Sequence, residues 1–194
     1  GEPGQKRVIT LELKLLADVG LIGLPNAGKS SLVAAASAAQ PKIADYPFTT
    51  LVPQLGVAQA SQGDPFTMAD IPGLVEGAHQ GAGLGLKFLK HVERTRLFAF
   101  VVDLSGEDPE YDLAVVRAEL EAYDPGLARR AGLVAANKND LPEAAGRLDE
   151  FKRSVESEGL TVFAISALKG DGVKDLIEEI HARLVREDIG SGPS

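Results

Sequence analysis

Short apolar runs alternate along this chain with longer segments in which apolar residues recur three or four positions apart. The run over residues 97–103 is apolar up to its final aspartate, which is typical of a strand buried on both faces of a parallel sheet. The segment 173–187 instead places its leucines and isoleucines on one face of a helix. Strands and helices in alternation predict an α/β fold, with a mostly parallel six-stranded sheet covered by helices on both faces.

The individual elements follow from this pattern and from the turn residues between them. The predicted strands are short apolar runs and cover residues 17–22, 55–60, 66–70, 97–103, 133–137 and 161–166. The predicted helices cover residues 30–39, 85–95, 110–123, a segment that begins at Pro142, and 173–187. We expect residues 17–188 to form one domain, residues 1–16 to be a linker or the end of a preceding domain, and residues 189–194 to be a flexible tail.

Composition narrows the class of protein. The 194 residues carry a net charge of −8, from 20 basic and 28 acidic side chains, which does not favour binding to nucleic acid or to an anionic membrane. The chain contains no cysteine, so disulfides, thiolate metal sites and cysteine nucleophiles are excluded. No window offers about 18 uninterrupted apolar residues, so no membrane-spanning helix is expected.

The segment between the first predicted strand and the first predicted helix carries the most specific motif. It reads Gly23-Leu24-Pro25-Asn26-Ala27-Gly28-Lys29-Ser30, two glycines around four residues and then Lys-Ser. In such a strand–loop–helix context, backbone N–H groups turn toward phosphate oxygens and the helix N-terminus adds partial positive charge. Lys29 is expected to reach the β- and γ-phosphates, and the Ser30 hydroxyl to hold Mg²⁺. The motif therefore predicts a phosphate-loop NTPase.

A second motif, Asn137-Lys138-Asn139-Asp140, directly follows a predicted buried strand. A carboxylate accepts two hydrogen bonds from N1–H and the 2-amino group of guanine, whereas adenine presents the opposite pattern, so Asp140 predicts selection of guanine. Asn137 is expected to tie this loop to the phosphate loop, and the stem of Lys138 to cover one face of the base. In the alternative interpretation, Asp140 is the N-cap of a helix that starts at Leu141-Pro142.

The last predicted strand ends in Ser166-Ala167-Leu168. Backbone N–H groups at this position would be able to reach the guanine O6. The alternative is an ordinary strand end followed by a turn over residues 169–172, and the motif on its own favours that alternative.

Two further segments are predicted to reach the phosphates. Asp70-Ile71-Pro72-Gly73 closes a strand with an acid, so Asp70 is expected to hold Mg²⁺ through water and the Gly73 N–H to point at the γ-phosphate. The segment between the first helix and the second strand contains Thr49 and Thr50. In such segments a threonine ligates Mg²⁺ when the triphosphate is present, and Thr50 is the better candidate.

Together these motifs resemble those of a translation-factor-class small GTPase with a Ras-like fold. The stretches Tyr46-Pro47-Phe48-Thr49-Thr50-Leu51-Val52-Pro53 and Gly73-Leu74-Val75-Glu76-Gly77-Ala78-His79-Gln80-Gly81-Ala82-Gly83-Leu84-Gly85 resemble signatures of the Obg family of bacterial GTPases. The resemblance implies a cytoplasmic GTPase that associates with the large ribosomal subunit, takes part in its assembly and responds to guanosine tetraphosphate. The candidate residues for binding GTP or GDP are Gly23, Leu24, Pro25, Asn26, Ala27, Gly28, Lys29, Ser30, Ser31, Phe48, Thr49, Thr50, Leu51, Val52, Asp70, Ile71, Pro72, Gly73, Asn137, Lys138, Asn139, Asp140, Ser166, Ala167 and Leu168.

Slow hydrolysis is expected, because Leu74 stands where many small GTPases carry a glutamine that orients water. The candidate catalytic residues are Thr50 and Asn26. Asn26 resembles the asparagine of potassium-activated GTPases, in which K⁺ touches the phosphates in place of an arginine, or alternatively it only shapes the loop. Because imidazole groups in general titrate near neutrality, His79 is a candidate general base, but an exposed loop residue is the favoured interpretation.

Two functional hypotheses follow from these residues. The first is a GTP-hydrolysing switch whose two segments order around Mg²⁺ and the γ-phosphate, which Thr50 and Asp70 favour. The second is a non-catalytic guanine-nucleotide sensor or scaffold that recruits partners, which Leu74 favours. An ATP-using relative is disfavoured by Asp140. A monomer is the default expectation for such a domain.

Overall fold

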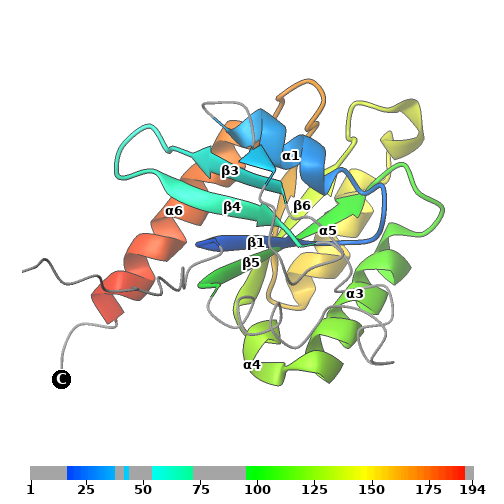
Figure 1. The fold of residues 1–194 in the computed structure, drawn as a ribbon. Helices are drawn as coiled ribbons and strands as arrows, with labels where there is room; N and C mark the ends of the chain where they lie inside the picture. Colours follow the sequence, from blue (N-terminus) through cyan, green and yellow to red (C-terminus); the bar gives the residue numbers. More distant parts are fainter. Residues whose placement is uncertain (1–16, 38–41, 44–53, 72–94, 191–194) are drawn as a thin grey trace, which may run out of the picture.

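The computed structural model describes residues 17–37, 42–43, 54–71 and 95–190. Its strands are β1 (Val19–Ile22), β2 (Lys42–Ile43), β3 (Gln54–Ala58), β4 (Phe66–Asp70), β5 (Leu97–Asp103), β6 (Ala131–Asn137) and β7 (Thr161–Ala164). They form one sheet in the order β2-β3-β4-β1-β5-β6-β7 (Figure 1). The strands from β4 to β7 in that order are parallel, and β3 runs antiparallel to both of its neighbours.

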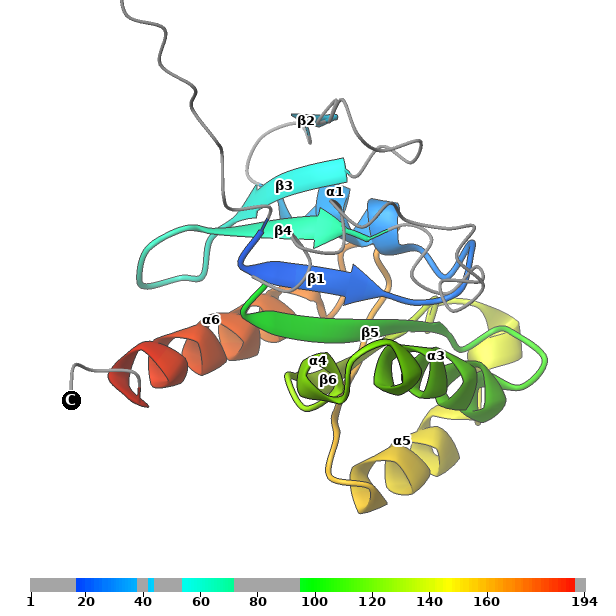
Figure 2. The ribbon, with the colours of Figure 1, turned by 60° about the horizontal axis from the view of Figure 1, so that its bottom comes forward.

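Helices cover both faces of this sheet. They are α1 (Lys29–Ala36), α3 (Pro109–Tyr123), α4 (Pro125–Ala128), α5 (Leu148–Ser157) and α6 (Val173–Gly190). Buried residues of α3, α4 and α5 share one hydrophobic cluster, and those of α1 and α6 share the other, so the two groups lie on opposite faces (Figure 2). Within the described ranges, no helix is both long and apolar enough to cross a membrane.

The alternation of side chains along β5 explains why that strand is apolar throughout. Successive residues enter the two clusters in turn, because neighbouring side chains of a strand point to opposite faces. The cluster under α3 receives Phe98, Phe100 and Val102, and the cluster under α1 and α6 receives Leu97, Ala99 and Val101. The predicted α/β fold with a doubly covered sheet is confirmed.

The structure differs from the predicted elements in a few places. All six predicted strands are present, β4 and β5 with the predicted ends and the other four with shifted ends. Strand β2 and helix α4 are additional. The helix expected from Pro142 is wrong in extent: residues Pro142–Ala144 form a single 3₁₀ turn, and α5 begins only at Leu148. Gly146 lies between them with φ of 82°, a left-handed conformation that interrupts a helix. Residues 1–16, expected to be a linker or the end of a preceding domain, and residues 85–94 of the expected helix lie outside the described residues.

Helix α6 has 18 residues, and hydrogen bonds connect its C-terminal part to the residue before β5. The Arg96 guanidinium, which directly precedes β5, donates to the Leu184 carbonyl at 2.8 Å and to Asp188 Oδ1 at 2.6 Å. The same guanidinium lies 3.9 Å from Asp18 Oδ1, next to the start of β1. The helix continues to Gly190, two residues into the segment expected to be a tail.

Candidate nucleotide-binding site

The predicted motifs meet at the edge of the sheet where the parallel strands end. In the register of β1 and β4, Leu21 lies opposite Asp70. In the register of β5 and β6, Asp103 lies opposite Asn137. Ligands of open parallel sheets bind beyond such strand ends. The phosphate loop, the acid that ends β4 and the loop after β6 therefore begin at one common edge.

Both glycines of the phosphate loop are required by close neighbours. Gly28 has a positive φ of 97°, and a Cβ atom there would strike the side-chain amide of Asn137. A Cβ atom on Gly23 would strike the backbone carbonyl of Val101 in β5. Because glycine has no Cβ, the loop turns tightly against β5 and delivers its chain into α1.

The remaining loop residues are held by their backbone and by Lys29. Asn26 also has a positive φ, 63°, a conformation that asparagine tolerates better than most residues, and it is exposed. The Lys29 ammonium donates to the carbonyl oxygens of Gly23 at 2.9 Å and Leu24 at 3.0 Å. The charged group thus spans the loop at the position where phosphate oxygens are expected.

Ser30 and Asp70 form the part of the site that suits a metal ion. The Ser30 hydroxyl donates to Asp70 Oδ2 at 2.5 Å. The Asp70 side chain is buried, and its Oδ1 atom has no hydrogen-bond partner among the residues that the structure describes. Mg²⁺ prefers such oxygen ligands and keeps several waters, one of which would satisfy a buried carboxylate oxygen. This donor set fits the expected ion, with the hydroxyl as ligand and the carboxylate acting through water.

Asn137 joins three segments that are far apart in sequence. Its side chain is 2% exposed; Nδ2 donates to the Ala27 carbonyl at 2.8 Å, and Oδ1 accepts from the Ala167 N–H at 2.9 Å. The expected tie between this loop and the phosphate loop is therefore present. It also reaches the Ser166-Ala167-Leu168 turn, which the sequence did not indicate.

Asp140 is held ready to accept hydrogen bonds. A hydrogen bond from the Ser166 side chain, and then the charge of Lys169, keep the pKa of the Asp140 carboxyl below its ordinary value, so it is ionised at neutral pH. The Lys169 ammonium lies 3.5 Å from Asp140 Oδ2. The alternative in which Asp140 caps a helix is wrong, because Leu141 is the N-cap of the 3₁₀ turn and makes no side-chain cap.

The turn after β7 has the ordinary turn structure of one predicted interpretation, and the contact to the guanine O6 stays a prediction. Ser166 is buried, its N–H donates to the Asp171 carbonyl at 2.9 Å, and its hydroxyl accepts from the Lys169 N–H at 3.1 Å. A turn over residues 167–172 is therefore present. The Ala167 N–H already donates to Asn137, whereas Leu168 is 88% exposed.

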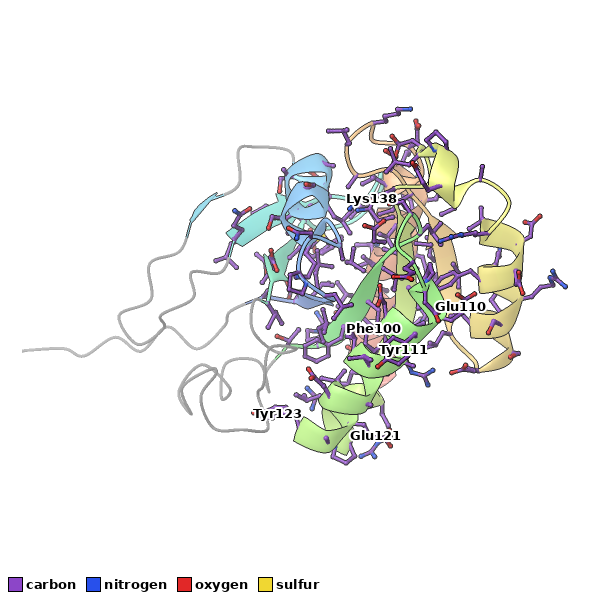
Figure 3. All side chains as sticks on the ribbon, turned by 90° about the vertical axis from the view of Figure 1, so that its right-hand side faces the viewer. Phe100, Glu110, Tyr111, Glu121, Tyr123 and Lys138 are labelled. Carbon is purple, nitrogen blue, oxygen red and sulfur yellow. The ribbon has the colours of Figure 1, made fainter. Side chains whose placement is uncertain are left out.

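Lys138 has a partner that the sequence did not single out. The lysine, which Figure 3 labels, has a positive φ of 62°. Its ammonium donates to Asp103 Oδ2 at 2.5 Å. Burial raises the pKa of the Asp103 carboxyl, but hydrogen bonds from Lys138 and Ser105 lower it further, so that its pKa is below the ordinary value. The available signal was the lone acid that ends an otherwise apolar strand at the site edge.

Several predicted residues lie outside the described part of the chain, and their roles stay predictions. Ile71 is described and buried, and its N–H donates to the Leu21 carbonyl at 3.2 Å. Asn139 is exposed and binds the Ile165 carbonyl through its N–H at 3.1 Å. The residues outside the described ranges are Phe48, Thr49, Thr50, Leu51, Val52, Pro72, Gly73, Leu74 and His79.

The fold and the arrangement of this edge define a phosphate-loop nucleotide-binding domain, and solved structures agree on the fold. The G domain of the T. maritima FeoB iron transporter matches with a TM-score of 0.64 at 23% identity, over 86% of this chain and 97% of that one. The cytosolic domain of L. pneumophila FeoB matches with a TM-score of 0.60 at 22% identity, over 86% of this chain and 67% of that one.

Residues 18–138 match the family model described as 50S ribosome-binding GTPase, and the chain belongs to that family. It is 54% identical to GTPase Obg of Desulforudis audaxviator, over 100% of this chain and 46% of that protein. It is 56% identical to GTPase Obg of Moorella thermoacetica, over 95% of this chain and 44% of that protein. The resemblance to Obg is confirmed, and the chain spans less than half the length of these relatives.

Proposed function

We propose that this chain is a guanine-nucleotide-binding domain that uses Mg²⁺ and slowly hydrolyses GTP to GDP and phosphate. The observation that carries the proposal is the pair of hydrogen bonds from Asn137, one to the phosphate loop and one to the turn after β7. Those bonds fix the loop suited to phosphates relative to the loops suited to guanine. Membership of a GTPase family supports the same assignment.

At the phosphate end, the loop N–H groups and Lys29 would bind the triphosphate. The Lys29 ammonium now donates to neutral carbonyls of the loop, and charged phosphate oxygens are stronger acceptors. When bound there, Mg²⁺ would supply positive charge that neutralises the phosphates. Ser30 would hold the ion directly and Asp70 through water. Thr50 would be a further ligand.

At the base end, Asp140 would accept the N1–H and 2-amino hydrogens of guanine. Its ionised state and its Ser166 hydrogen bond favour two acceptors facing the base. The Leu168 N–H would donate to O6. The Lys138 stem would cover one face of the ring. These groups disfavour adenine, which offers an acceptor where Asp140 requires a donor.

Hydrolysis is proposed to be slow because Leu74 has no polar atom to orient the attacking water. The same residue favours the second candidate function, a guanine-nucleotide sensor or scaffold without useful turnover. Single-turnover phosphate release separates the two. Release that is slow but clearly above the rate of GTP in buffer supports the switch, and release at the buffer rate supports the scaffold.

A potassium dependence of this hydrolysis is expected from Asn26. Its side chain is exposed at the loop, where it would hold K⁺ against the phosphates. We expect hydrolysis to be about tenfold or more faster in KCl than in NaCl, because a cation there stabilises the transition-state charge. Phosphate release in the two salts is the measurement.

Two variants separate the side chain of Asn26 from its backbone. Asn26→Gly keeps the positive φ accessible and should lose the difference between the salts, with the NaCl rate unchanged. Asn26→Ala should lose the difference too, with additional strain on the loop. Equal wild-type rates in both salts would show that Asn26 only shapes the loop.

We further propose that the domain acts as a monomeric switch in assembly of the large ribosomal subunit. Membership of a family of 50S ribosome-binding GTPases supports this setting. Guanosine tetraphosphate would compete for the same guanine and phosphate groups, in the cytoplasm. Sedimentation of the protein with purified large subunits, in GTP, GDP and guanosine tetraphosphate, tests the partner. If the same amount of protein sediments with and without large subunits, the proposed association is contradicted.

Nucleotide titration tests the central proposal. We expect GTP and GDP to bind about a hundredfold or more tightly than ATP, because a site built to pair with polar groups rejects the analogue that leaves them unpaired. Removing Mg²⁺ should weaken GTP binding more than GDP binding, since the ion would neutralise the additional negative charge of the triphosphate. Isothermal calorimetry gives the affinities. Equal affinities for GTP and ATP would exclude Asp140 as guanine selector.

A further inference from the structure

We infer that Asp103 is a positioning residue for the base: it fixes the Lys138 ammonium so that the lysine stem lies over the guanine. The inference rests on the proposed binding of guanine nucleotides at this edge. Asp103 does not itself contact the nucleotide in this arrangement. It acts through Lys138, and nothing in the phosphate-loop or Asn-Lys-Asn-Asp motifs assigns it a role.

The sheet brings the two residues together. Asp103 is the last residue of β5 and lies opposite Asn137, the last residue of β6. Lys138 follows directly and turns back with its positive φ. Its ammonium reaches Asp103 Oδ2, in a pair of which the two side chains are 31% and 23% exposed. The backbone reinforces the junction, because the Leu104 N–H donates to the Asn137 carbonyl at 3.0 Å.

Hydrogen bonds from Ser105 fix the Asp103 carboxylate. Its Oδ1 atom accepts from the Ser105 N–H at 2.9 Å and from the Ser105 hydroxyl at 2.5 Å. The carboxylate therefore uses one oxygen to fix its own position and the other to fix Lys138. A lysine stem has four rotatable bonds, and its ordering costs free energy if it happens only when the base binds. Pre-ordering by Asp103 removes part of that cost from nucleotide binding.

Asp112 on α3 provides a matched control. It lines the same small cavity as Asp103, between the phosphate loop, β5 and α3. Burial, followed by the charges of Asp108 and Asp103, raises the pKa of its carboxyl. In the part of the chain that the structure describes, Lys138 forms its side-chain hydrogen bond and ion pair with Asp103 and not with Asp112. Replacing either acid with asparagine removes one negative charge from this region, but only Asp103→Asn removes the partner of the lysine.

The test is a double-mutant cycle in the whole chain, read as the dissociation rate of fluorescently labelled GDP. We expect Asp103→Asn and Lys138→Met each to speed dissociation about three- to tenfold, since loss of one member of a hydrogen-bonded charge pair acts mainly on dissociation. The double variant should be no faster than the faster single variant, because both remove the same link. Asp112→Asn should stay within about twofold of the wild type.

A second readout separates positioning from general damage. Hydrolysis of GTP at saturating protein in a single turnover should keep its wild-type rate in Asp103→Asn, because the phosphate loop is not altered. Multiplicative effects in the double variant, a slower single turnover, or unchanged dissociation would overturn the inference. If Asp103→Asn does not fold, the test uses the dissociation of labelled GDP from Lys138→Met. A wild-type rate overturns the inference, and a faster rate supports it. A wild-type chain that binds no guanine nucleotide contradicts the proposed function instead.

Discussion

Asp140→Asn should lower the affinity for GTP by about a hundredfold or more, because two guanine donors then face a group that offers only one acceptor. The side-chain amide also places its own N–H₂ against a guanine donor. Xanthine carries a 2-oxo group in place of the 2-amino group, so the amide can donate to it. We therefore expect the variant to prefer xanthosine triphosphate over GTP, as measured by calorimetry with both nucleotides.

Asp171→Asn is a suitable control for this change. It removes one negative charge from the same turn, but Asp171 binds Ser166 only through its backbone carbonyl, and its side chain is exposed. Its affinities for GTP and for xanthosine triphosphate should match those of the wild type. An Asp140→Asn variant with the wild-type preference would refute the role of Asp140 as the base selector.

Asn137→Ala is expected to damage both folding and binding. It leaves the Ala27 carbonyl and the Ala167 N–H without their partner, in an interior where the Asn137 side chain is 2% exposed. An unpaired buried polar group costs about 1–3 kcal/mol, so the free energy of unfolding should fall by about 2–5 kcal/mol. Urea unfolding measures that loss, and GDP affinity at a temperature where the variant is folded should also fall.

The neighbouring asparagine gives the comparison for that prediction. Asn139 is exposed and contributes a backbone N–H to Ile165, so Asn139→Ala should change the free energy of unfolding by no more than about 0.5 kcal/mol. Equal stability of Asn137→Ala and Asn139→Ala would mean that the two buried hydrogen bonds contribute nothing to the fold. If Asn137→Ala loses stability but keeps the GDP affinity of the wild type, the two hydrogen bonds of Asn137 do not contribute to nucleotide binding.

The fold was predictable from the sequence because its strongest signals are local. The run over 97–103 already requires cover on both faces, and the glycines of the phosphate loop already require a tight turn between strand and helix. The helix after Pro142 was misplaced because a propensity signal competed with Gly146, whose left-handed φ stops the chain from continuing. A glycine inside a helical pattern is only a weak indication of a helix end, but here Gly146 separates the 3₁₀ turn from α5.

The sequence predicted one connection within the candidate site, the tie from Asn137 to the phosphate loop, but not the others. Motif spacing identifies Asn137 and Asp140, yet the bond from Asn137 to the Ala167 N–H depends on where β7 lies next to β6. Asp103 was missed for the same reason, since its meeting with Lys138 is set by strand register across 35 residues. Such pairings depend on tertiary structure, so the partner of an acid at a strand end cannot be identified from the local sequence.

Helix α6 supports the turn that follows β7. With 18 residues it extends about 27 Å away from the turn that follows β7. Toward its other end, Arg96 donates hydrogen bonds to the Leu184 carbonyl and to Asp188 Oδ1 and so holds the helix to the start of β5. A change in the tilt of the helix would have to break these two hydrogen bonds. Contacts made far from the turn therefore help to keep its orientation relative to the sheet.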